Sequence, residues 1–208
     1  LSKYAPEDKG MLSSFAGREL LSVEEYEANA VNHDETMKKA YRLQDLAKQI
    51  GEHSAMIPKL EQQMEALAPW KSFDLPLDFK GTKKSVAFIG SIQEEISLEQ
   101  LREQLGALAP EAETIDLNIV SSSKEQTCLF IVCAKGDADA VEDALKKLNF
   151  VKPPLSSLVP AKRQQQLEEE LSKVKAEIAG AEKAIADMAP DRDSIKFVMD
   201  YYTMRSEK

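Results

Sequence analysis

The side chains that could perform chemistry in this chain are few. Its 208 residues include two histidines, His33 and His53, and two cysteines, Cys128 and Cys133. Nucleophilic catalysis by serine or cysteine needs a histidine held beside the nucleophile. Both histidines fall within one predicted helix, and no sequence feature brings a nucleophile to either of them. The sequence therefore predicts no nucleophilic catalysis.

The cysteines do not form a recognisable redox or metal motif. Cys128 and Cys133 are five positions apart within an apolar run, which is neither CxxC nor a disulfide framework. An odd separation along one strand directs two side chains to opposite faces. We expect two free thiols in a reducing, cytosolic environment.

The motifs that bind phosphates, dinucleotides or catalytic zinc do not occur in the sequence (GxxxxGK[ST], GxGxxG, HExxH, GxSxG). The run from Gly81 to Lys84 (GTKK) looks like the end of a phosphate loop, but it precedes a predicted strand instead of opening a helix. The abundant carboxylates are typical of solvated helical surfaces. We expect no catalytic residue, no cofactor, no metal ion and no small-molecule substrate.

The charge argues against a nucleic-acid partner. The net charge is −9, whereas binding to phosphates depends on clustered Lys and Arg. Residues 69–160 alone carry 10 basic and 14 acidic residues, a net charge of −4.

No apolar run approaches the roughly 18 residues that a membrane span needs. We therefore expect this piece to be soluble by itself.

Two long heptad seams are the strongest structural signal. Apolar positions alternate by three and four residues over more than three heptads in each segment, with Glu, Lys, Gln and Ala between them, which predicts a coiled coil. The seam residues are Leu43, Leu46, Ile50, His53, Ile57, Leu60, Met64 and Leu67 in the first helix, and Leu167, Leu171, Val174, Ile178, Ala181, Ile185 and Met188 in the second.

We expect these helices to pair in opposite directions, because they flank a compact segment that can join two neighbouring helix ends. The expected register places Ile50 opposite Ala181 and His53 beside Ile178, with a shift of one heptad as the alternative. It also places Gly51 opposite Gly180. The two glycines either allow a close approach of the backbones or are tolerated at about 1 kcal/mol each.

Two residues of the first helix break its pattern. Pro58 lies inside it and predicts a bend, because the ring clashes with the preceding turn and removes a hydrogen bond. His53 occupies a seam position, where a histidine serves as a pH switch, as a metal ligand or as an ordinary, partly exposed polar residue. No second ligand stands at a suitable spacing, so we favour the ordinary residue.

Between the helices, residues 83–152 change to a mixed strand and helix pattern. Apolar or alternating runs predict strands over 84–92, 114–121 and 126–134, with a short fourth strand at 150–152. Ser97 and Gln100 form a capping box that opens one helix, and 136–149 has the spacing of another. The order β-α-β-β-α-β is the ferredoxin-like arrangement.

The expected fold class is therefore α+β: a long antiparallel two-helix coiled-coil hairpin that carries a small ferredoxin-like lobe. The expected parts are a loop and helical lead-in (1–30), the first helix (31–68), a junction (69–82), the lobe (83–152) and the return helix (153–208). We expect the junction residues Trp70, Phe73, Leu75 and Leu77 to fix the lobe on the helices. Because the helical pattern is still running at the last residue, we interpret the chain as a fragment of a longer protein.

The junction resembles a known family. The run from Leu67 to Leu77 (LAPWKSFDLPL), followed by Gly81-Thr82 and a strand ending in Phe88-Ile89-Gly90, is similar to subunit I of bacterial and archaeal V-type ATPases, the counterpart of eukaryotic subunit a. The order helix, lobe, helix looks like the cytoplasmic half of that subunit. The stretch from Ile195 to Arg205 (IKFVMDYYTMR) resembles its return helix.

The resemblance implies a non-catalytic stator in a membrane complex at the cytoplasmic face of the cell membrane. In that family the distal lobe binds the helix heterodimers of the peripheral stalks. A C-terminal membrane domain, which this chain lacks, moves protons or sodium ions in a process coupled to ATP. No ion-path residue matches a position here, and the face of lobe 83–152 that binds a partner is unknown.

Two other classes remain as alternatives. A coiled-coil tip domain of a DNA-organising or chaperone-like clamp would dimerise through its lobe and often has a basic surface. A ferredoxin-like ligand-sensing module would have a pocket between its sheet and helices.

Overall fold

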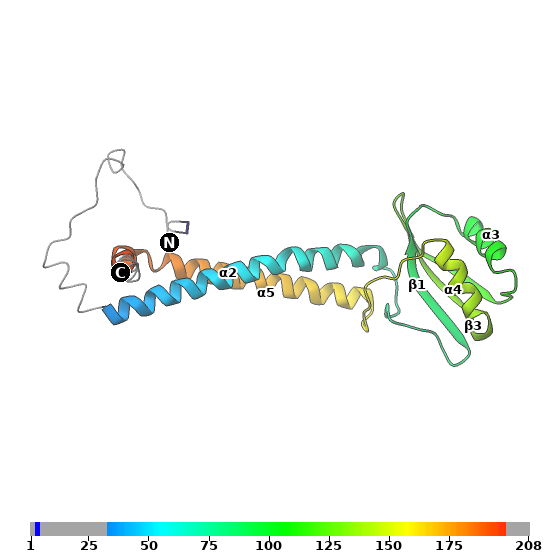
Figure 1. Cartoon of the computed structure of the whole chain (residues 1–208), viewed down its shortest axis with the longest axis horizontal. Coiled ribbons are helices and arrows are strands. Elements are labelled where there is room, and N and C mark those ends of the chain that lie inside the picture. Colours follow the sequence, from blue (N-terminus) through cyan, green and yellow to red (C-terminus); the bar gives the residue numbers. More distant parts are fainter. Residues whose placement is uncertain (1–2, 5–32, 199–208) are drawn as a thin grey trace, which may run out of the picture. The chain divides into compact units, whose positions relative to one another are not determined.

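The computed structural model describes residues 3–4 and 33–198 (Figure 1). The expected lead-in over 1–30, except Lys3 and Tyr4, and the end of the return helix beyond 198 lie outside the described residues. The described chain forms two compact units. One contains the residues up to Pro58 and from Ser172 onward, and the other is Lys59–Leu171.

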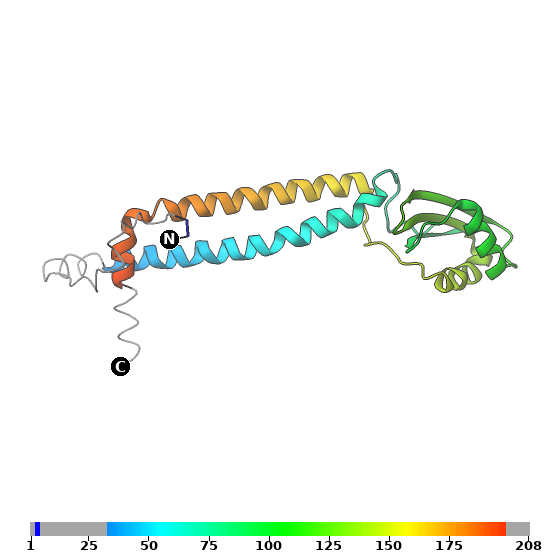
Figure 2. The same cartoon turned by 90° about the horizontal axis from the view of Figure 1, so that it is seen from above.

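Two long helices run through both units. Helix α2 spans His33–Leu67 and helix α5 spans Pro160–Ala186; within each unit they lie side by side in opposite directions (Figures 1 and 2). From Leu43 to Leu67, every residue outside the seam is exposed, whereas the seam positions are buried or partly buried. The heptad pattern of apolar residues thus determines which side of α2 is covered.

In the first unit, contacts between α2 and α5 define their register. Ile50, Ala181 and Ile185 form a buried cluster, and Leu43, Leu46, Ile178 and Tyr4 pack against it. Nearby, Lys39 Nζ lies 2.6 Å from Asp191 Oδ1. A shift of one heptad would displace such partners by about 10 Å, so the shifted register does not fit these contacts.

Of the two alternatives for Gly51 and Gly180, the close approach of the backbones does not occur. Both glycines are exposed, and a Cβ atom added to either would meet no atom within 4 Å. Each glycine immediately neighbours a seam residue on the solvent side of its helix, so neither lies where the two helices touch. Pro58 lies within α2, which continues through it to Leu67.

The second unit contains a three-stranded antiparallel sheet with two helices on one face (Figures 1 and 2). The strands are β1 (Ser85–Ile92), β2 (Ile115–Ser122) and β3 (Thr127–Ala134), in the order β1-β3-β2. The helices are α3 (Leu98–Leu108) and α4 (Ala138–Lys147). Together with the helix pair, this sheet confirms the predicted α+β class. Single 3₁₀ turns, η2, η3 and η4, occupy Ala68–Trp70, Lys135–Asp137 and Ala189–Asp191.

The expected fourth strand over 150–152 is reduced to one bridge between Ser91 and Val151. Each of these residues donates its N–H to the carbonyl of the other at 2.8 Å. Pro153 and Pro154 follow immediately, and proline has no N–H to continue the pairing. The chain therefore leaves β1 after a single pair.

The lobe core lies between the sheet and its two helices. Leu129, Ile131 and Cys133 of β3 pack there with Leu101 and other residues of α3 and α4. Ser97 accepts a hydrogen bond from Gln100 N at 3.2 Å, and Ser97 N donates to Gln100 Oε1 at 3.0 Å, so the capping box is present.

Replacing either exposed helical glycine by alanine should stabilise the chain. We expect Gly51→Ala and Gly180→Ala each to raise the free energy of unfolding by up to about 1 kcal/mol, because alanine is the better helix former and its methyl group meets no atom. Urea denaturation followed by circular dichroism measures the change.

Gly81→Ala is the matched control. Gly81 has a φ of 108°, and a Cβ there would lie 2.4 Å from Ser85 O, so this variant should be destabilised. If the two helical variants also lost stability, their added methyl groups would be meeting the opposite helix. Gly51 and Gly180 would then allow a close approach after all.

Candidate functional site

The segment between α2 and β1 covers the face of the sheet that α3 and α4 leave open. Helix α2 ends at Leu67, and η2, which contains Pro69, then turns the chain toward the sheet. Trp70, Phe73 and Leu77 are 3%, 7% and 3% exposed, and Leu75 is partly buried. The four junction residues thus lie in one apolar layer of the second unit.

Aromatic contacts hold this layer to the sheet. The rings of Phe73 and Phe130 are 5.2 Å apart between centroids, and Phe79 approaches Phe130 at 6.4 Å. Trp70 meets Phe73 edge to face at 6.0 Å. On strand β3, Phe130 alternates with Leu129 and Ile131 of the lobe core, so its side chain points to the opposite face. The sheet is therefore covered on both faces.

The same compact unit contains the adjoining ends of both long helices. Leu60 and Leu67 of α2 are buried, as are Pro160 and Leu167 of α5. Arg163 of α5 donates a hydrogen bond to Gln63 Oε1 at 3.2 Å. The lobe is consequently attached to two helices at once.

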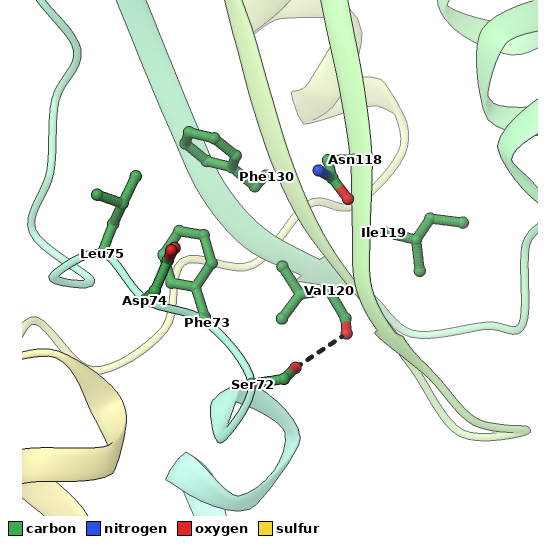
Figure 3. Close-up of a pocket in the computed structure, with 8 residues that line it drawn as sticks. All are labelled: Ser72, Phe73, Asp74, Leu75, Asn118, Ile119, Val120 and Phe130. Carbon is green, nitrogen blue, oxygen red and sulfur yellow. Dashed lines mark hydrogen bonds between the residues drawn. The ribbon is translucent and has the colours of Figure 1, made fainter.

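A hollow of about 280 Å³ lies between the covering segment and strands β2 and β3 (Figure 3). Ser72 closes one end by donating a hydrogen bond from Oγ to Val120 O at 3.4 Å. Asp74 is the ionisable residue of the lining, whose members are Ser72, Phe73, Asp74, Leu75, Asn118, Ile119, Val120 and Phe130. This lining combines aromatic walls with a single carboxylate, which suits binding better than acid–base catalysis.

The seam histidine has a partner that the sequence interpretation missed. His53 Nε2 lies 3.4 Å from Glu177 Oε2, and the two side chains are 26% and 43% exposed. This contact is an ion pair only when the imidazole is protonated. Glu177 adjoins Ile178, the expected neighbour of His53, so the register itself could have identified it.

Both cysteines are buried free thiols. Burial raises the pKa of Cys128, although a hydrogen bond with Ser121 lowers it in part. Burial also raises the pKa of Cys133, with a further upward contribution from the charge of Asp137. A raised pKa keeps a thiol protonated and therefore unreactive.

Within 3–4 and 33–198, no three His, Cys, Asp or Glu side chains are grouped to hold a metal ion. Over the same residues, no helix is both long enough and apolar enough to span a membrane.

No protein-family model matches this chain, and no curated protein matches it in sequence. Among solved structures, it is similar to the crystal structure of the cytoplasmic N-terminal domain of subunit I, homolog of subunit a, of V-ATPase, with a TM-score of 0.48 and 12% sequence identity. The match covers 90% of this chain and 72% of that one. This is a likeness of fold, and it assigns neither an activity nor a partner to the chain.

Removing the central ring of the aromatic layer should destabilise the second unit. We expect Phe73→Ala to lower the free energy of unfolding by about 3–5 kcal/mol, because it leaves a cavity against Phe130. Urea denaturation followed by the fluorescence of Trp70, the sole tryptophan, measures the change.

A double-mutant cycle of Phe73 and Phe130 should give a coupling of about 0.5–1.5 kcal/mol. Leu155→Ala is the control: its side chain is 75% exposed, so we expect a change within about 0.5 kcal/mol. Equal effects of Phe73→Ala and Leu155→Ala would refute the importance of the layer.

The two thiols should react only when the lobe unfolds. Iodoacetamide should modify Cys128 and Cys133 much more slowly in the folded chain than in urea.

The same thiols should make the stability of the chain depend on pH. Because folding raises the pKa of both thiols, the unfolded chain loses these protons at a lower pH than the folded chain does. The free energy of unfolding should therefore fall as the pH rises above about 8.5. This decline should be smaller when both cysteines are replaced by alanine. If the free energy of unfolding of that variant fell just as steeply with pH, the two thiols would not be its cause.

Proposed function

We propose that the chain is a non-catalytic stator part of a V-type rotary ATPase, from the cytoplasmic region of subunit I. In this proposal the lobe binds the helix heterodimers of the peripheral stalks. The helix pair leads toward a membrane domain of the same subunit, on the cytoplasmic face of the cell membrane. The chain thereby takes part in ATP-coupled transport of protons or sodium ions without making or breaking bonds itself.

The observation that carries the proposal is the attachment of the lobe to both helices through the junction. The run 67–77 is also the part of the sequence that resembles subunit I. Its residues Leu67, Trp70, Phe73 and Leu77 are all buried within the unit that contains the sheet and the two helix ends. The segment that carries the resemblance is therefore part of the packing of this unit, which supports the proposal.

Attachment to two helices suits a part that resists torque. A lobe on a single flexible linker would turn when a load was applied, because such a linker behaves as a random coil. Here the chain enters the unit from α2 and leaves it through α5, and Gln63 and Arg163 connect the two helices. A load on the lobe is thus shared by two packed helices.

The two alternative classes fit the described residues less well. A DNA-organising clamp often has a basic surface, whereas residues 69–160 carry a net charge of −4 from 10 basic and 14 acidic residues. A ligand-sensing module would have its pocket between sheet and helices. In this lobe that space contains buried side chains such as Leu101, Leu129 and Val141.

Binding to a stalk tests the proposal. The full chain should bind a peripheral-stalk helix heterodimer of a V-type ATPase weakly and saturably in calorimetry, because a stator with several attachments gains its strength from their sum. Hydrogen exchange should slow in residues 83–152. The chain alone should hydrolyse no ATP.

A designed coiled coil of the same length and net charge is the control, and it should produce no heat of binding. If circular dichroism and Trp70 fluorescence show that the lobe is folded, and the stalk heterodimer still does not bind, the proposal is refuted. Equal binding of the designed coil would refute it as well, because the interaction would then be unspecific.

A further inference from the structure

The two edges of the lobe sheet differ in how the chain covers them. Along β1, Gly81 bridges Val86, and Ala87 N donates to Lys80 O at 3.0 Å. At the other end of β1, Ser91 pairs with Val151. The segments before β1 and after α4 thus cover the outer edge of this strand.

Strand β2 is at the other end of the sheet order, so no strand among the described residues pairs with its outer side. Ala134 N donates to Thr114 O at 3.3 Å, and Ile115 lies opposite Cys133 in the adjoining register. Hydrogen-bonded pairs alternate along an antiparallel ladder. By this alternation the backbone N–H and C=O groups of Ile115, Leu117 and Ile119 point away from β3.

The hollow described above adjoins this edge. Asn118 and Val120 of β2 lie on one side of it and the covering segment on another, whereas the side chain of the lining residue Ile119 points to the opposite face of the sheet (Figure 3). The rings of Phe73 and Phe130 offer apolar surface, and Asp74 provides a negative charge. A lysine or arginine side chain has the matching character, since its apolar stem packs on rings and its charged end pairs with a carboxylate.

The charges beside the edge favour a cationic partner. Residues 71–75 and 111–124, which include the covering segment at the hollow and strand β2, contain four carboxylates (Asp74, Glu111, Glu113 and Asp116) and two lysines (Lys71 and Lys124), a net charge of −2. Pairing of β2 with β2 of a second copy would bring these like charges together, which is unfavourable. A basic segment of another protein would instead place its positive charges beside these carboxylates, which is favourable.

We propose that the outer edge of β2 binds an extended basic segment of a partner protein by strand addition, with one Lys or Arg side chain in the hollow beside Asp74. Backbone hydrogen bonds to the edge would supply affinity, and the hollow would supply specificity. The inference concerns this edge alone and does not depend on the proposed stator function.

A short peptide tests the edge. The probe is an eight-residue peptide of alternating Thr and Val with one central Arg, titrated into the full ¹⁵N-labelled chain. We expect the amides of Ile115, Leu117 and Ile119 to shift and to exchange more slowly, while those of Ala87 and Ser91 on β1 stay unchanged. A peptide of the same charge with N-methyl groups at alternate residues should not bind, because it cannot form the ladder.

The matched variants test the hollow. Asp74→Asn should weaken binding of the Arg peptide about two- to five-fold, the range of an exposed ion pair, and should leave binding of a Gln-containing peptide unchanged. Asp143→Asn removes one carboxylate from the exposed side of α4 and should leave both affinities unchanged.

Three results would overturn the proposal. One is equal binding of the N-methylated peptide, which would show adsorption by charge alone. Another is an absence of shifts on β2. The third is dimerisation of the chain in light scattering with protection of β2, since a second copy would then occupy the edge.

Discussion

Burial of the second face of the lobe sheet is the constraint on which the rest of the second unit depends. Strand β3 is apolar on both sides: Leu129 and Ile131 face the helices, and Phe130 faces away from them. An aromatic side chain buries about 150–250 Å², so Phe130 left in water would forgo much of the stabilisation that this strand gains. Phe73 and the residues around it satisfy that need.

The segment that covers this face is also the path of the chain from α2 into β1. The sheet therefore cannot separate from the end of α2 without exposing Trp70, Phe73 and Phe130. The lobe and the adjoining helix ends are stabilised by one set of contacts, and they form one compact unit. A unit of this kind transmits load through packed side chains, which deform far less than a flexible linker.

Much of the fold follows from the sequence because its signals are local and periodic. The seam around Ile50 and the capping box at Ser97 depend on spacings within one helix, and such spacings are visible in the sequence. The distance between two backbones is not visible in the sequence, which is why the sequence left open whether Gly51 and Gly180 allow a close approach. The fourth strand was overestimated because Val151 has the composition of a strand, while Pro153 limits its pairing to one bridge.

The candidate site was predictable only in part. The aromatic residues of the junction are conspicuous in the sequence, but contact between Phe73 and Phe130 joins segments 57 positions apart, and no local pattern gives that distance. The hollow beside Asp74 depends on the same non-local packing. The pairing of His53 with Glu177, in contrast, could have been inferred from the expected register, because Glu177 adjoins Ile178.

The two edges of the sheet differ in their residues, and these differences can be recognised in the sequence. A Cβ at Gly90 would lie 2.4 Å from Val151 O, and Gly81 adopts a φ of 108°, so the cover of the β1 edge depends on two glycines. No strand or bridge among the described residues pairs with the outer side of β2. Strand β2 carries the exposed Asp116 and a register irregularity between Ile119 and Ser121, and charges and bulges are the features by which open edges avoid pairing with copies of themselves. An edge protected in this way discourages a like-charged strand, yet the outward backbone groups of Ile115, Leu117 and Ile119 remain without a strand partner, which a strand of opposite charge would supply.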